Sequence, residues 1–186
     1  MIYFSMKLRK PLMDEGQKSV WSDFMEKYPI LFQQKDLPMN RTCMCWGIDC
    51  PEGWHDIVKD VCNKIETINN TVGKDHNFEI QAIQVKEKFG TLRFYIGNYP
   101  KEDASDEDME LARLFEEICE DVVTRAEYLT ESVCQVCGRP IYEGNRVVSR
   151  GWIGYYCPEC AEKKGVIPWN NYPDDPVDPK KNETSK

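Results

Sequence analysis

The sequence predicts an α+β fold, with about three helices packed on an antiparallel β-hairpin or small sheet, followed by a C-terminal four-cysteine zinc ribbon or treble-clef module. Apolar residues recur at helical spacing in three stretches, whereas over residues 78–96 apolar and polar residues alternate, as in a strand. Two C-x-x-C pairs lie near the C-terminus. Shifts in composition divide the chain into an N-terminal segment (1–13), an α+β domain (14–131), a zinc-binding module (132–167) and an acidic, proline-rich tail (168–186) that we expect to be flexible.

The composition of the chain limits the kinds of protein that it can be. The chain has 186 residues, with 24 Lys and Arg against 32 Asp and Glu, nine Cys and two His. The net charge of −8 disfavours nucleic acid or an anionic membrane as a default partner. Neither a run of 18 apolar residues nor a secretion signal is found, so we expect a cytoplasmic protein without a membrane partner. Its cysteines should then be free thiols or metal ligands.

Three helices are predicted. The first spans residues 14–28 and stops at Pro29, and the second begins near Pro51 and runs to Ile68. The third opens at Ser105, where Asp108 three residues later forms a weak capping box. On the second and third helices, Cys62 and Cys119 lie on the apolar stripe and should pack as small core hydrophobes. The predicted buried stripe of the third helix is Leu111, Leu114, Phe115, Ile118, Cys119 and Val122, continuing to Ala126 and Leu129.

The region of the third helix is strongly acidic. Residues 102–131 hold twelve Asp and Glu against two Arg, which is a charge of −10 and leaves the remaining chain at +2. A solvated helix face is the ordinary interpretation, and mimicry of a phosphate backbone is the alternative.

The alternating stretch predicts a β-hairpin, because Gly90 separates its two halves. A loop of two or four residues puts Ile83 and Val85 on one face with Leu92, Phe94 and Ile96. A three-residue loop would scramble that apolar face, so the even loop is predicted. The opposite face then carries Gln84, Lys86, Lys88, Thr91, Arg93 and Tyr95.

That polar face contains the predicted ligand-binding residues Lys86, Lys88, Arg93 and Tyr95. Cationic side chains bind phosphate and an aromatic ring stacks on a base, so the set suits a nucleotide or a short nucleic acid. The alternative is that these cations pair with the surplus carboxylates of the chain.

The most specific motif is a four-cysteine metal site formed by Cys134, Cys137, Cys157 and Cys160. The two C-x-x-C pairs are separated by 19 residues, which is a spacing typical of structural zinc. Four thiolates complete a tetrahedral coordination sphere and leave no open position for catalysis, so the predicted role of the zinc is structural. Residues 146–149 and 152–156 can pair as strands between the two turns.

A second, looser group of possible metal ligands consists of Cys43, Cys45, Cys50 and His55. It lacks the two C-x-x-C pairs that are typical of a zinc site. It is either a second metal site or, as we favour, a loop with incidental thiols. Cys50 could also act as a nucleophile with His55 as its base, since a helix start lowers a thiol pKa. No nucleotide-binding, zinc-protease or serine-hydrolase motif occurs in the sequence, and no catalytic residue is assigned.

Six segments carry a resemblance. They are KYPILF (27–32), WGIDCPEGW (46–54), IQVKEKFGTLRFYI (83–96), CQVCG (134–138), GW (151–152) and CPEC (157–160). In this order, over about residues 17–163 and most specifically in VKEKFGTLRFY, the chain resembles a group of small bacteriophage and prophage proteins of uncharacterised activity. Cys43, Cys45 and the acidic tail depart from that pattern.

The resemblance implies a phage accessory protein made in the bacterial cytoplasm, with a zinc-binding C-terminal module. Together with the missing catalytic motifs, it favours a non-enzymatic protein that binds a host factor, such as a component of host defence. Binding of a nucleotide or short nucleic acid is the first alternative, and an enzyme using Cys50 and His55 is the second. The oligomeric state stays open.

Overall fold

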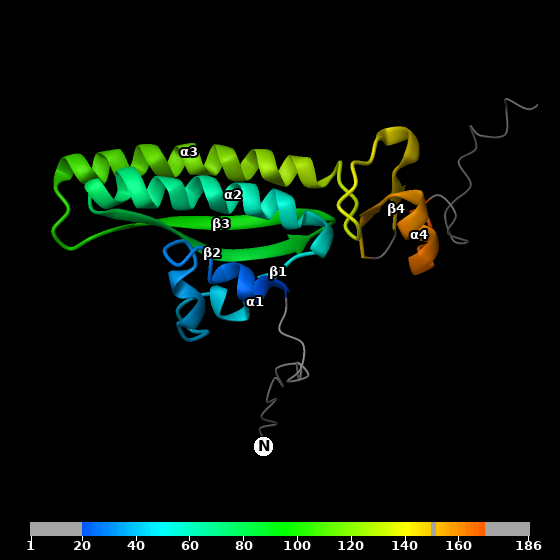
Figure 1. Cartoon of the computed structure of the whole chain (residues 1–186), viewed down its shortest axis with the longest axis horizontal. Coiled ribbons are helices and arrows are strands. Elements are labelled where there is room, and N and C mark those ends of the chain that lie inside the picture. Colours follow the sequence, from blue (N-terminus) through cyan, green and yellow to red (C-terminus); the bar gives the residue numbers. More distant parts are fainter. Residues whose placement is uncertain (1–19, 150–151, 170–186) are drawn as a thin grey trace, which may run out of the picture.

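The computed structural model describes residues 20–149 and 152–169, which form an α+β domain with a small module at one end (Figure 1). The predicted N-terminal segment, the beginning of the first predicted helix and nearly all of the predicted tail lie outside the described residues. The predicted fold class is confirmed. Its sheet, however, is a mixed one of three strands rather than a hairpin alone.

The sheet is ordered β1-β2-β3. The antiparallel pair comprises β2 (Phe78–Lys88) and β3 (Thr91–Pro100), and the short β1 (Ile48–Asp49) lies parallel to β2. Helices α2 (His55–Ile68) and α3 (Asp106–Thr130) lie side by side over one face of the sheet (Figure 1). The short α1 (Val20–Met25) packs against the start of α2, where the rings of Trp21 and Phe24 contact His55. Short helical turns complete the domain at Gln33–Asp36, Met44–Trp46, Glu52–Trp54 and Asn69–Gly73.

The core lies between these layers. Trp54, which ends the turn before α2, is fully buried, as are Phe32 and Leu31 from the segment after α1. Cys62 and Cys119 are also fully buried, which confirms their assignment to the core. The carboxylate of buried Glu66 on α2 accepts hydrogen bonds from the Leu31 and Ile30 amides at 2.9 and 3.2 Å, so α2 fixes the loop beneath it.

The capping box of α3 is confirmed, since the Ser105 hydroxyl accepts from the Asp108 amide and the Asp108 carboxylate accepts from the Ser105 amide. The predicted buried stripe is partly wrong. Leu114, Ile118 and Leu129 are 51%, 42% and 51% exposed. The buried residues are instead mostly small: Ala112, Cys119, Val123, Ala126 and Thr130. Of these, Thr130 reaches β3, where its hydroxyl accepts from the Leu92 amide.

Crossing a membrane takes a helix that is both long and apolar, and none of the helices in the described part of the chain is both.

The hairpin has the predicted even loop. Lys88 pairs with Thr91, so the loop is Phe89-Gly90, and both residues have positive φ (55° and 82°), as in the type I′ turn that suits strand twist. Ile83 was predicted on the wrong face. A β-bulge between Ala82 and Gln84 makes Ile83 the extra residue, and it packs beside Gly97, on the face opposite Phe94.

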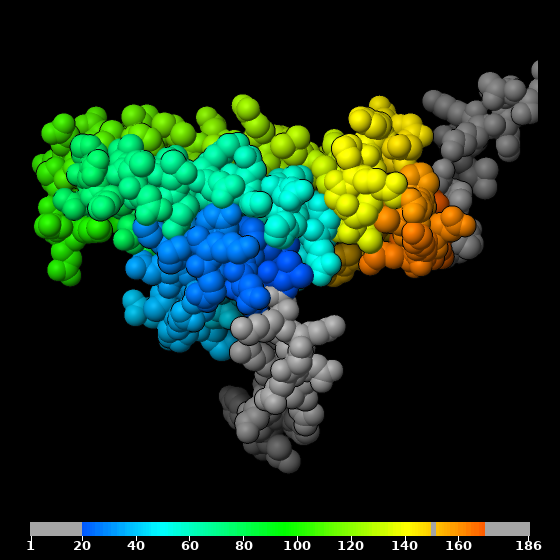
Figure 2. Space-filling view, viewed as in Figure 1, coloured from blue at the N-terminus to red at the C-terminus, as the bar shows by residue number. Residues whose placement is uncertain are grey.

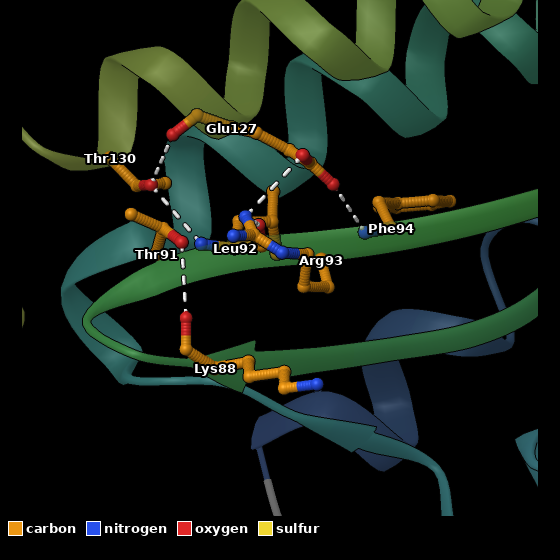
Figure 3. Close-up of polar contacts among 7 residues, drawn as sticks. All are labelled: Lys88, Thr91, Leu92, Arg93, Phe94, Glu127 and Thr130. Atoms are coloured by element: carbon orange, nitrogen blue, oxygen red, sulfur yellow. Dashed lines mark hydrogen bonds and ion pairs between the residues drawn. The ribbon is translucent and has the colours of Figure 1, made fainter. Parts of the chain in front are cut away.

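The outer edge of β3 is covered by side chains of α3 (Figure 3). The Leu92 amide donates to the Thr130 hydroxyl at 3.2 Å, and the Phe94 amide donates to one Glu127 carboxylate oxygen at 3.1 Å. The other Glu127 oxygen pairs with the Arg93 guanidinium at 3.4 Å. Backbone donors that an edge strand would leave unpaired are therefore satisfied within the domain.

Replacing Glu127 by Ala should lower the free energy of unfolding by about 1–3 kcal/mol, because the Phe94 amide and Arg93 both lose their partner. Urea denaturation measures this change. Glu120→Ala, at an exposed position on the same helix, is the control and should change stability by less than about 0.5 kcal/mol. Equal effects of the two substitutions would contradict the edge-covering role of Glu127.

Candidate metal centre

The C-terminal module presents its cysteines from two short structural units. Cys134 and Cys137 lie on a turn that ends at Gly138, whose φ of 71° permits the sharp reversal. A hairpin of β4 (Val147–Val148) and β5 (Tyr155–Tyr156) follows, as the sequence predicted. Cys157 then caps α4 (Pro158–Lys164), which contains Cys160. A cysteine turn, a hairpin and a helix bearing the last ligand follow the order of the predicted treble clef rather than that of a plain ribbon.

The structure brings the four predicted cysteines together. Their sulfur atoms all lie within 4.8 Å of one another, which is the arrangement that one tetrahedral metal ion requires. Cys134, Cys157 and Cys160 are buried and Cys137 is exposed. These four residues could hold a metal ion, and four sulfur ligands would fill its coordination sphere.

Arg139 ties the two cysteine units together. Its Nε donates to the Cys137 sulfur at 3.4 Å, its Nη2 reaches the Cys157 sulfur at 3.8 Å, and the same guanidinium pairs with Glu159 on α4. Sequence reasoning missed this residue. The available signal was a basic side chain directly after C-x-x-C-G.

The thiol pKa values reflect this environment. Desolvation raises the pKa of Cys137, but the hydrogen bonds from Arg139 and from the neighbouring cysteines outweigh desolvation and lower the pKa to about 6. Desolvation and the adjoining thiols raise the pKa of Cys160 to about 12. The cluster thus holds one thiol that ionises readily beside one that resists ionisation, and a bound cation would favour the thiolate form of both.

The cysteine module packs directly against the α+β domain (Figure 2), and Gly53 lies at this contact. The Gly53 amide donates to the Gln135 carbonyl at 3.1 Å. A Cβ atom placed on Gly53 would lie 2.2 Å from the Cys134 carbonyl oxygen, and one placed on Gly138 would lie 2.9 Å from the Gly53 oxygen. Only glycine permits this backbone approach.

The tip of the β2–β3 hairpin forms a second contact with the module. Gln135 donates from its side-chain amide to the Gly90 carbonyl at 3.3 Å. Gly90 is packed against Ile153 and Tyr155, each 3.0 Å from the position of a Cβ on this glycine. Two loops of the domain, at Gly53 and at Gly90, therefore contact the module, one at the cysteine turn and the other at both the turn and the module hairpin.

A pocket of about 440 Å³ opens at this junction. Asp49, Glu52 and Glu87 supply carboxylates, Lys164 supplies a cation, and Trp152 supplies a ring that is 78% exposed. The carboxylates outnumber the cation, so this pocket is unsuited to a phosphate group. Its lining draws on the WGIDCPEGW, VKEKFG and CQVCG segments, which are far apart in the sequence.

The predicted ligand-binding residues lie together on the hairpin. Lys86 is directly opposite Arg93, and Tyr95 is 45% exposed. Arg93 pairs with Glu127, and the Lys88 ammonium lies 5.3 Å from the centre of the Phe89 ring. Part of the predicted cationic face is therefore already engaged within the protein.

The second cysteine group is not brought together. Among the described residues, only the four C-terminal cysteines form a cluster close enough to hold a metal ion. Burial, followed by the charges of Asp49 and Glu87, raises the pKa of Cys50 well above its usual range, so its thiol is neutral. The helix α2 starts at His55, whose ring stacks on Trp21 at 5.6 Å between centroids.

No protein-family model, curated protein or solved structure matches this chain, so the chemistry of the site is inferred from its own residues.

Replacing Gly53 by Ala should force the domain and the module apart, because the added methyl group overlaps the Cys134 carbonyl. We expect the free energy of unfolding to fall by about 3 kcal/mol, at the upper end of overpacking costs. We also expect faster hydrogen exchange at the amides of residues 53 and 135. Gly144→Ala is the matched control, since nothing lies within 4 Å of its Cβ position. If both variants behave like the wild type, the close approach at Gly53 is not required for docking.

Proposed function

We propose that this chain is a non-enzymatic accessory protein of the phage type, which binds a host protein in the bacterial cytoplasm on a scaffold stabilised by zinc. The observation that carries the proposal is the closed cluster of four cysteine sulfurs within 4.8 Å, docked on the domain through Gly53. Such a centre supports structure rather than chemistry, because no ligand position remains for substrate or water.

Zinc is favoured over other metals by the donor set. Four thiolates in tetrahedral array are typical of structural zinc, and two C-x-x-C turns are its usual protein frame. The module has a small apolar core of its own, formed by Ile141, the partly buried Tyr155 and Tyr156, and the three buried cysteines, Cys134, Cys157 and Cys160. Its folding should accordingly depend on the metal.

Binding is favoured over catalysis by the state of the candidate nucleophile. The raised pKa of Cys50 keeps its thiol protonated at neutral pH. The sequence contains none of the common catalytic motifs that would supply another centre. A host protein as partner, and a role in countering host defence, rest on the sequence resemblance and on the acidic surface of α3.

Binding of a nucleotide is the second candidate, supported by one observation. Lys86 and Arg93 are directly opposite each other on adjacent strands, and like charges at such positions repel unless an anion binds between them. The pairing of Arg93 with Glu127 reduces the charge available to a phosphate, so this function ranks below protein binding.

The purified protein should contain one equivalent of zinc, measured by elemental analysis. Cys134→Ser combined with Cys160→Ser should abolish zinc binding and remove hydrogen-exchange protection from residues 132–167, while α2 and β2 stay protected. Cys43→Ser combined with Cys45→Ser is the matched control, because these thiols lie outside the cluster, and it should retain full zinc. Zinc loss in the control, or full zinc in the first variant, would contradict the assignment.

Tagged zinc-loaded protein expressed in a bacterial host should co-purify with one host protein in near-stoichiometric amount. The complex should then re-form from the two purified components. Thermal shift with ATP and with an oligothymidine tests the second candidate in parallel, with Lys86→Ala as its variant. A shift that Lys86→Ala removes, without any reconstituted protein complex, would replace the first proposal by the second.

A further inference from the structure

A groove of about 450 Å³ lies between α2 and α3. Its floor is apolar, formed by Ile57 of α2 with Ile118, Val122 and Leu129 of α3. A neighbouring hollow of about 500 Å³ shares Leu129 and extends the surface to Tyr128. This groove is separate from both the metal centre and the junction pocket.

The apolar floor is unusual for the helix on which it lies. Helix α3 carries nine acidic and two basic residues, yet Ile118 and Leu129 on its outer side are 42% and 51% exposed. Single exposed aliphatics are common on protein surfaces, whereas a row of them along a groove marks an interaction site. From Ile118 to Leu129 the row spans about 16 Å, which is about three helical turns.

The charge around the groove selects the kind of occupant. Asp56 and Asp60 border it on α2, and Asp121 borders it on α3. Lys64 and Arg125 also line the groove, which leaves its lining with a net charge of −1, and Lys64 is paired with Asp60 at 2.5 Å. A second copy of this chain would place one acidic α3 against another, so self-association through this face is disfavoured by charge.

We propose that the groove binds an amphipathic helix of the partner protein, with aliphatic side chains on one face and Lys or Arg residues beside them. Apolar anchors spaced at i, i+4 and i+11 would lie along Ile118, Val122 and Leu129, in the helix-in-groove mode of recognition. The flanking cations would meet Asp56 and Asp121, because Asp60 is already paired with Lys64. This inference rests on the proposed function, since it gives the chemistry of the host-protein segment.

Three synthetic peptides of 15 residues test the groove on the full zinc-loaded chain. The first is an amphipathic helix with leucines at the anchor positions and lysines beside them. The second replaces each lysine by glutamate, and the third scrambles the first to remove the apolar face. Fluorescence anisotropy should show saturable binding of the first peptide and at least tenfold weaker binding of the other two. Equal binding of the scrambled peptide would reduce the effect to general charge attraction and overturn the proposal.

Variants locate the binding on the protein. Ile118→Ser and Leu129→Ser should each weaken the first peptide at least tenfold, while thermal unfolding shows that both remain folded. Ile167→Ser is the matched control, because Ile167 is 51% exposed, as Leu129 is, and lies outside the groove. Wild-type affinity in both groove variants would overturn the proposal.

Two further outcomes separate this inference from the function on which it rests. Dimerisation in sedimentation that Leu129→Ser abolishes would assign the groove to a second copy and overturn the proposal. A reconstituted host complex that persists unchanged in Ile118→Ser and Leu129→Ser would also overturn it, while leaving the proposed function in place.

Discussion

The close backbone approach between Gly53 and the turn at Cys134 joins the two parts of this molecule. One hydrogen bond, from the Gly53 amide to the Gln135 carbonyl, fixes the register of the contact, and the absence of a side chain at Gly53 makes the distance possible. Trp54 follows immediately and is fully buried, so the same loop is anchored in the core on one side and on the cysteine turn on the other. A metal ion that orders the turn would therefore also hold the loop.

That loop leads directly into α2, which begins at His55 and forms one wall of the groove. The order along the chain thus links the metal centre, the junction and the groove through a few residues. Arg139 adds to the rigidity of this end of the molecule, because it contacts sulfurs from both cysteine units and a carboxylate on α4.

Local patterns in the sequence predicted much of the fold. The C-x-x-C spacing anticipated the sulfur cluster, and Ser105 with Asp108 marked the start of α3, because both signals act over a few residues. The bulge at Ile83 was not predicted, because apolar and polar residues alternate on both sides of it and nothing in the pattern marks an extra residue. The exposure of Ile118 and Leu129 could not be predicted either, because the neighbouring element, and not the apolar spacing, decides which side of a helix is buried. The contact of Gly53 with Cys134 joins residues 81 positions apart, and only the assembled fold reveals it.

The covering of β3 by Thr130 and Glu127 has a consequence for how a partner can be recognised. Many proteins capture an extended peptide as an extra strand, using the unpaired amides along the rim of a sheet. Here the amides of Leu92 and Phe94 are already occupied by side chains of the same chain. Over this stretch a foreign strand would have to displace α3 before it could pair. A protein that contacted this stretch of the rim would therefore meet side chains rather than free backbone amides.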